Sequence, residues 1–179
     1  SEIGFGGEWL ERHPEEDGID LIHYASAQGI NILDCWMPDP KSRDIIGKGI
    51  KDNRRQWYIQ GHIGSTWKDE QYFRTRDMKY VRTAFEDLLR RLQTDYIDLY
   101  LIHWPDAQVP LEETMDALNT LKQQGKVLHV GVSNFSREQI EEANRYCPIE
   151  AYQPQYSMVF RGNEPQMRWA AEQGIGVMS

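Results

Sequence analysis

The sequence predicts an α/β fold, a (β/α)8 barrel of the TIM type, with about seven of the eight strands within its 179 residues. Short apolar runs alternate with helical patterns along the chain, which is typical of a parallel sheet covered by helices. Polar residues stand at the ends of successive runs, where a barrel gathers its site. No phosphate-binding glycine fingerprint follows the first run, which disfavours an open dinucleotide-binding sheet. We therefore expect 1–179 to form a single, incomplete barrel domain.

The expected strands are apolar runs of the length typical of buried strands. They lie at 2–6, 31–35, 58–63, 97–103, 127–134, 150–158 and 174–179. A barrel without its last strand has two unpaired edges, which favour aggregation. We expect the sequence to be a fragment of a longer protein, with a seven-stranded product closed by a partner chain as the alternative.

The clearest helix is expected at 77–92, because its apolar residues recur at helical spacing on one face. Its exposed side carries Glu86 with Arg90 and Asp87 with Arg91, each pair four residues apart. The apolar face consists of Tyr80, Val81, Ala84, Phe85, Leu88, Leu89 and Leu92.

Other helix ends are marked by residues with defined capping chemistry. Pro110 is expected to open one helix and Gly125 to close it. Ser136 and Gln139 have the spacing of a capping box. Gly29 and Gly174 stand where a helix should give way to a strand.

Composition excludes several classes of protein. The formal net charge is −8 and the pI about 5.1, so a nucleic-acid partner has no basic surface to bind. No apolar run is long enough to span a membrane, and no signal peptide opens the sequence. Cys35 and Cys147 lack metal-ligand spacing and are expected as reduced thiols, which favours a cytoplasmic location.

The most informative motif is DYIDLYLIHWPD at 95–106, an apolar strand that ends on His103. Together with QGINILD at 28–34 and VGVSNF at 130–135, it closely resembles the aldo-keto reductases over essentially the whole sequence. The resemblance implies a barrel that moves hydride from a nicotinamide cofactor onto an aldehyde or ketone. NADP(H) is the expected cofactor, and NAD(H) stays open because the discriminating positions lie beyond Ser179.

The resemblance also implies roles for individual residues. Asp34 and His103 match the family's catalytic aspartate and histidine. Ser133, Asn134 and Gln153 match positions that hydrogen-bond the nicotinamide carboxamide. Independently, tryptophans near strand ends often line pockets, so we expect a substrate pocket walled by Trp9, Trp36 and Trp104.

Two positions depart from the family's catalytic set. Asp39 stands where the family has its proton-donor tyrosine, and His62 stands where it has a lysine. In the family the lysine lowers the pKa of the tyrosine phenol. Without the tyrosine, a lysine at this position has less to do. We expect His62 to pair with Asp34 across adjacent strand ends. Its imidazolium could then donate the proton while His103 steers the substrate.

Three functions remain open from the sequence. The leading one is a carbonyl-reducing oxidoreductase with an altered proton donor. The second is an inactive, nicotinamide-binding pseudoenzyme with a regulatory or scaffold role. The third is a metal-dependent enzyme that would use Asp34, His62 and His103 as a two-histidine, one-carboxylate triad; the leading function has no metal site. Neither the substrate nor the oligomeric state can be predicted. The segment 64–73 is expected to be a long loop that shapes the pocket, with a plain surface loop as the alternative.

Overall fold

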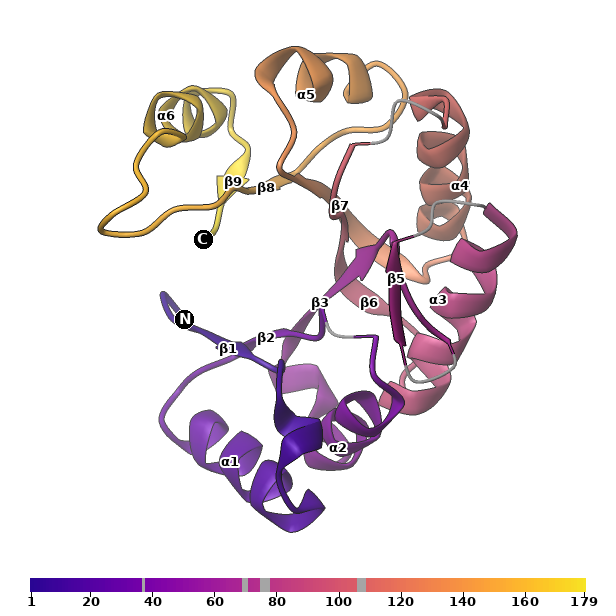
Figure 1. Cartoon of the computed structure of the whole chain (residues 1–179), viewed down its shortest axis with the longest axis vertical. Coiled ribbons are helices and arrows are strands. Elements are labelled where there is room, and N and C mark those ends of the chain that lie inside the picture. The colour runs from indigo at the N-terminus through magenta and orange to yellow at the C-terminus, as the bar shows by residue number, and fades with distance from the viewer. Residues whose placement is uncertain (37, 69–70, 75–77, 106–108) are drawn as a thin grey trace. The chain divides into compact units, whose positions relative to one another are not determined.

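The computed structural model describes residues 1–36, 38–68, 71–74, 78–105 and 109–179. The contacts of the chain gather in two compact units, Ser1–Asp98 and Leu99–Ser179. The single domain expected for 1–179 stays a prediction. Each unit is described in turn (Figure 1).

The first unit alternates strands and helices. In Figure 1, α1 and α2 lie on the same side of the short strands β1 and β2. The turn of 3-10 helix η1 follows β1, and a second one, η2, precedes β3. In chain order the elements are β1 (Gly4–Gly6), η1 (Leu10–Arg12), α1 (Glu15–Ala27), β2 (Ile32–Asp34), α2 (Pro40–Ile50), η2 (Arg54–Gln56), β3 (Tyr58–Ile63), β4 (Ser65–Lys68), β5 (Gln71–Arg74) and α3 (Met78–Leu92).

Strands β1, β2 and β3 pair in parallel, and their register brings the strand ends together. Gly6 lies beside Asp34, and Asp34 lies beside Gln60. In a parallel sheet all carboxyl ends face the same edge. The side chains that follow these positions therefore share one edge of the sheet.

The second unit continues the alternation. Strands β7, β8 and β9 pair in parallel, with Ser133 beside Gln153 in the register of β7 and β8. Its elements are β6 (Ile97–Ile102), whose first two residues belong to the first unit, α4 (Leu111–Gln123), β7 (Val127–Ser133), α5 (Arg137–Ala143), β8 (Ala151–Gln153), α6 (Glu164–Glu172) and β9 (Gly176–Val177).

The main sheet has the strand order expected of the barrel. In the described residues it runs β1-β2-β3-β6-β7-β8-β9. Apart from β4 and β5, which form a separate sheet, each strand lies beside the one that precedes it in the chain. All seven predicted strands are present, although most are shorter than the apolar runs. The order and the parallel pairing agree with the (β/α)8 type.

One prediction is wrong: the segment 64–73 is not an irregular loop. It contains β4 and β5, which pair antiparallel with Ser65 beside Arg74 and Lys68 beside Gln71. The residues Thr66, Trp67, Tyr72 and Phe73 have strong strand propensity, which accounts for the hairpin. Residues 69 and 70, between the two strands, lie outside the described residues.

The sixth repeat strand is also shorter than predicted. The apolar run suggested 150–158, whereas β8 ends at Gln153. Pro154 follows at once, and a proline has no N–H to donate to a ladder. Strand β7 ends one residue early, because Asn134 adopts a left-handed φ of 59°.

The helices follow the sequence closely. Helix α3 begins at Met78, next to the predicted start at Asp77, which lies outside the described residues. Four residues of its apolar face are buried in the core, namely Phe85, Leu88, Leu89 and Leu92. The capping box of Ser136 and Gln139 on α5 is confirmed. Gly29, Gly125 and Gly174 all have positive φ after their helices, as the predicted helix ends require.

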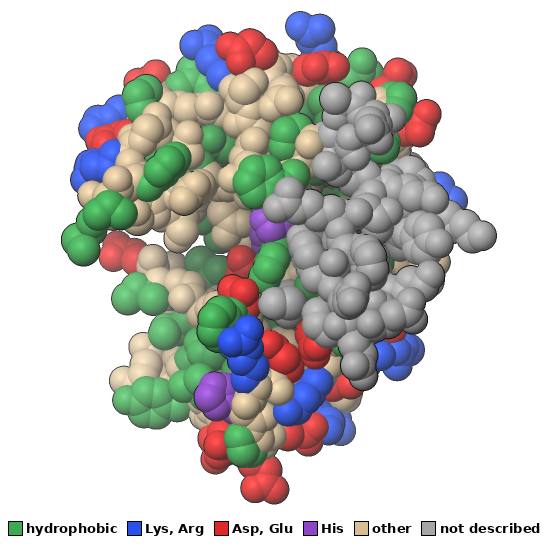
Figure 2. Space-filling view, viewed as in Figure 1, with side chains coloured by type: hydrophobic (Ala, Val, Ile, Leu, Met, Phe, Trp, Pro, Cys, Tyr) green, Lys and Arg blue, Asp and Glu red, His purple; other side chains and the backbone are tan. Residues whose placement is uncertain are grey.

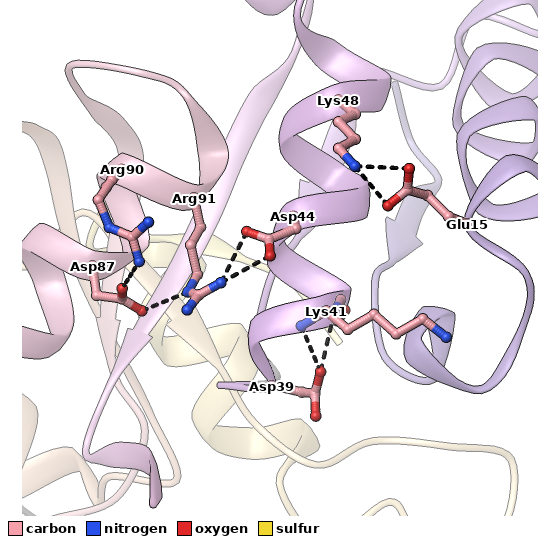
Figure 3. Close-up of polar contacts among 9 residues, drawn as sticks. Glu15, Asp39, Lys41, Asp44, Lys48, Asp87, Arg90 and Arg91 are labelled. Atoms are coloured by element: carbon pink, nitrogen blue, oxygen red, sulfur yellow. Dashed lines mark hydrogen bonds and ion pairs between the residues drawn. The ribbon is translucent and has the colours of Figure 1, made fainter.

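An ion pair joins α3 to α2, and two more lie within α3. Arg91 donates to both carboxylate oxygens of Asp44 at 3.0 and 2.8 Å, and to Asp87 at 2.9 Å (Figure 3). Arg90 also hydrogen-bonds Asp87. The predicted pairing of Asp87 with Arg91 is therefore confirmed.

A buried ion pair joins β3 to the start of β6. Arg54 donates to Asp98 Oδ2 at 2.8 Å, and the same oxygen accepts the Ile59 N–H at 2.9 Å. Arg54 also donates to Thr94 Oγ1 and to the carbonyls of Trp57 and Tyr96. This guanidinium therefore ties η2 and the residue after it to the segment 94–98.

The outer surface is charged. Figure 2 shows Asp, Glu, Lys and Arg side chains over α1 and α2 in one unit and over α5 and α6 in the other. This is the distribution expected of helices that bury one face against a sheet. Among the described residues no helix has the length and apolar character that crossing a membrane would need.

Candidate active site

Asp34 ends β2, and its carboxylate is held from several directions. Oδ1 accepts the Trp36 N–H at 2.9 Å, which fixes the carboxylate against the chain that leaves the strand. Oδ2 accepts from Gln60 Nε2 at 2.8 Å. The side chain is 25% exposed, so the carboxylate is partly open although it is hydrogen-bonded.

His62 lies on β3 beside this carboxylate. Its Nε2 is 3.1 Å from Asp34 Oδ1, and its side chain is 3% exposed. The predicted pairing of the two residues is therefore confirmed. A buried imidazole next to a carboxylate is oriented by it, as in many sites that move a proton.

Gln60 is a member of this cluster that the sequence analysis missed. It lies two residues before His62 on β3, so both side chains leave the same face of the strand. Its Nε2 contacts Asp34 Oδ2 at 2.8 Å and His62 Nε2 at 3.0 Å. The spacing i, i+2 from a candidate histidine was the signal that could have identified it.

The two neighbours of His62 Nε2 favour different hydrogen positions. Asp34 Oδ1 can only accept when ionised, so this contact requires a hydrogen on Nε2. The amide nitrogen of Gln60 can only donate, so this contact requires a bare Nε2. The ring nitrogen therefore lies between an acceptor and a donor.

Cys35 directly follows Asp34 but is not a nucleophile. Burial raises the pKa of its thiol to about 12, with a smaller opposing effect from Arg43. Its Sγ donates to the Gln60 carbonyl, and the side chain is buried in the core. Cys147 is also buried, and burial raises its pKa as well. Both cysteines are free thiols, as predicted.

Asp39 caps a helix. Its Oδ1 accepts the N–H groups of Lys41 at 2.8 Å and Ser42 at 3.2 Å, and Pro40 begins α2 (Figure 3). A carboxylate at this position satisfies N–H groups that the first turn leaves unpaired.

In the second unit, His103 follows the last residue of β6. The Asn134 side chain donates to the His103 carbonyl at 3.0 Å and to Ser133 Oγ at 3.0 Å. The left-handed backbone of Asn134 turns this side chain back across the strand end. The predicted residues His103 and Asn134 therefore lie together.

Ser133 and Gln153 complete this group at the ends of β7 and β8. Ser133 Oγ donates to the Gln153 carbonyl at 2.7 Å, and its side chain is buried. The structure thus brings together the three residues predicted to hold the carboxamide. Asp34 and His62 form their own cluster in the first unit.

The three tryptophans have different surroundings. Trp9 is half exposed at 49% and lies under the Arg12 guanidinium, 3.7 Å from the ring centroid. Trp36 follows Asp34 and is partly buried. Trp104 stacks on His103 with 5.6 Å between ring centroids. Their role as pocket walls stays a prediction.

The metal alternative has no support in the described part of the chain. Its His, Cys, Asp and Glu residues include no group of three placed to hold a metal ion. The carboxylate of Asp34 is instead committed to amide, imidazole and main-chain donors.

The fold is a parallel α/β fold of the (β/α)8 type, and in each unit polar residues lie at strand ends. The model of the aldo/keto reductase family matches residues 2–179. The chain belongs to the aldo/keto reductase family.

Similar sequences and structures agree with this assignment. The chain is 37% identical to aldo-keto reductase YhdN of Bacillus subtilis, over 89% of this chain and 49% of that protein. It is 33% identical to probable aldo-keto reductase 1 of Glycine max, over 99% of this chain and 54% of that protein. It therefore spans about half the length of these relatives.

Solved structures confirm the fold class. Glycerol dehydrogenase AKR11B4 from Gluconobacter oxydans matches with a TM-score of 0.90 and 31% identity, over 99% of this chain and 58% of that chain. An aldo-keto reductase from Klebsiella pneumoniae in complex with NADPH matches with a TM-score of 0.84 and 25% identity, over 99% and 62%.

Proposed function

We propose that the protein is an NADP(H)-dependent oxidoreductase that reduces an aldehyde or ketone, in which His62, paired with Asp34, donates the proton in place of the family's tyrosine. The observation that carries the proposal is the 3.1 Å contact between His62 Nε2 and Asp34 Oδ1. Family membership and the NADPH-bound relative support the reaction class.

The polar group of the second unit suits a nicotinamide carboxamide. Ser133 offers a hydroxyl, and Asn134 and Gln153 offer amides, at the ends of neighbouring strands. These neutral donors and acceptors complement a carboxamide, which itself has both. When bound, the cofactor supplies hydride to the carbonyl carbon. These residues would hold and orient its ring.

The proton for the carbonyl oxygen is assigned to His62. Its Nε2 lies between an acceptor on Asp34 and a donor on Gln60. Asp34 stabilises the imidazolium before the proton leaves, and Gln60 stabilises the bare nitrogen afterwards. His103 orients the carbonyl group. The pocket walls remain assigned to Trp9, Trp36 and Trp104, and a cytoplasmic location remains expected.

A pseudoenzyme that binds the cofactor without turnover is the second candidate. The observation in its favour is Asp39, whose carboxylate accepts two N–H groups of α2 and is therefore committed to the helix. In that case the ancestral proton donor is lost without replacement. The polar group of the second unit would still bind nicotinamide.

One experiment separates the two candidates. The intact protein is titrated with NADPH while nicotinamide fluorescence is followed, and then a panel of aldehydes and ketones is added. Binding followed by loss of the NADPH absorbance supports the reductase. Binding without oxidation of NADPH by any member of the panel supports the pseudoenzyme, and the absence of binding contradicts both.

A further inference from the structure

We propose that Asp39 and Ser42 are positioning residues for Asp34, connected to it by a hydrogen-bonded path through Gly7. The proposal rests on the proposed function, because Asp34 matters there as the partner of His62. It assigns a role to Asp39, and to the buried hydroxyl of Ser42, which takes no part in the proposed reaction.

The path begins at the first turn of α2. Asp39 Oδ1 accepts the N–H groups of Lys41 and Ser42, which fixes the start of the helix (Figure 3). Pro40 has its φ already set for the first helical position. The position of the Ser42 backbone is therefore set by the cap.

The second step runs from α2 to the end of β1. Ser42 Oγ donates to the Gly7 carbonyl at 2.8 Å, and the Ser42 side chain is almost fully buried, at 1% exposure. A buried hydroxyl is costly unless it is bonded, so this contact fixes the position of Gly7 relative to the helix.

The third step runs from Gly7 to the site. The Gly7 N–H donates to the Asp34 carbonyl at 2.8 Å. A Cβ at position 7 would lie 2.9 Å from that carbonyl oxygen and 2.7 Å from Cδ1 of Ile46 on α2. The space between Asp34 and α2 therefore admits only a glycine at position 7, because any larger residue would force the two apart.

The main chain of Asp34 is thus held by Gly7, while its carboxylate contacts His62. Its carbonyl belongs to the path, whereas Oδ1 contacts His62 Nε2 at 3.1 Å. A displacement of α2 would move the Asp34 backbone and change this contact. Errors of about 1 Å in a site can lower a rate by roughly 100-fold.

The test uses four variants of the intact protein with histidine-selective 15N labelling. Asp39→Ala removes the cap, and Ser42→Ala removes the donor to Gly7. Asp39→Asn keeps a cap, because asparagine caps as well as aspartate. Ser136→Ala removes the side-chain cap of α5, and is the control for the loss of a helix cap in the other unit.

The readouts are the 15N resonances of the His62 ring across a pH titration and, where turnover is measured, kcat separately from KM. We expect Asp39→Ala and Ser42→Ala to shift the His62 resonances and its titration. We also expect them to lower kcat by roughly 10- to 100-fold with KM for NADPH unchanged. Asp39→Asn and Ser136→Ala should leave the His62 signals as in the wild type.

Two results would overturn the proposal. One is a His62 spectrum that stays the same in Asp39→Ala and Ser42→Ala. The other is an equal change in Ser136→Ala, which would mean that any lost cap disturbs the site. The spectra decide this even if the wild type reduces no carbonyl, so failure of the proposed function is distinguishable from failure of the path.

Discussion

His62 Nε2 lies 3.1 Å from Asp34 Oδ1, across two neighbouring parallel strands of one sheet. The same carboxylate accepts the Gln60 amide and the Trp36 N–H. Asp34 is thus oriented by three groups, two on β3 and one in the segment that follows β2. The pair is a fixed part of the fold, which is the first requirement for a group that transfers a proton.

The close passage of Gly7 predicts a sharp difference between two adjacent glycines. In Gly7→Ala the new Cβ would meet the Asp34 carbonyl oxygen and Ile46, so we expect a loss of about 1–3 kcal/mol of unfolding free energy. In Gly6→Ala no described atom beyond the two neighbouring residues lies within 4 Å of the new Cβ, so we expect a smaller loss. Urea unfolding of both variants tests this, and equal stabilities would contradict it.

The Arg54–Asp98 pair should contribute far more to stability than a surface pair. Both side chains are nearly buried, at 12% and 11% exposure. Arg54→Met would leave Asp98 with an uncompensated charge, so we expect a loss of about 3–5 kcal/mol in urea unfolding.

Lys48 and Glu15 provide the matched control. Their contact of 2.7 Å is as short, but both side chains are about half exposed (Figure 3). Lys48→Met should cost about 0–1 kcal/mol. A similar loss of unfolding free energy in Arg54→Met and Lys48→Met would show that the buried pair stabilises the fold no more than the exposed pair.

Asp87 should make stability sensitive to acid. Partial burial raises its pKa, but the hydrogen bonds from Arg90 and Arg91 outweigh this, and the pKa lies below its usual value. A lowered folded pKa means that the contribution is complete above the unfolded value of about 3.9 and is lost as pH falls toward the folded pKa.

Urea unfolding of the wild type and Asp87→Asn from about pH 6 to about pH 2 checks this. The wild type should be more stable at the upper end, by less than about 1 kcal/mol because the pair is partly exposed. The difference should vanish at the lower end. A difference that grows with acidity would contradict the assignment.

Much of the fold was predictable because periodicity and capping are local. The apolar face of α3 and the capping box of Ser136 and Gln139 depend on residues within a few positions of each other. The pairing of Asp34 with His62 was also predictable, because carboxyl ends of successive parallel strands meet at one edge.

Other features depend on contacts that no local pattern encodes. The i, i+2 spacing places Gln60 on the same face of β3 as His62, but its contact with Asp34 depends on the register of β2 and β3. Asp39 lies between two prolines, and its role as a cap depends on where α2 begins. The hairpin of β4 and β5 was missed because the segment's length suggested a loop more strongly than its aromatic residues suggested strands.

The most direct test of the central claim is the effect of His62→Asn on kcat and on NADPH binding in the intact protein. Asparagine cannot carry the proton, so kcat should fall by roughly 100- to 10,000-fold while the affinity for NADPH stays unchanged. His129→Asn is the control, since His129 pairs with Glu150 at 2.9 Å outside the cluster, and it should keep full turnover. Full turnover by His62→Asn would show that His62 is not the proton donor.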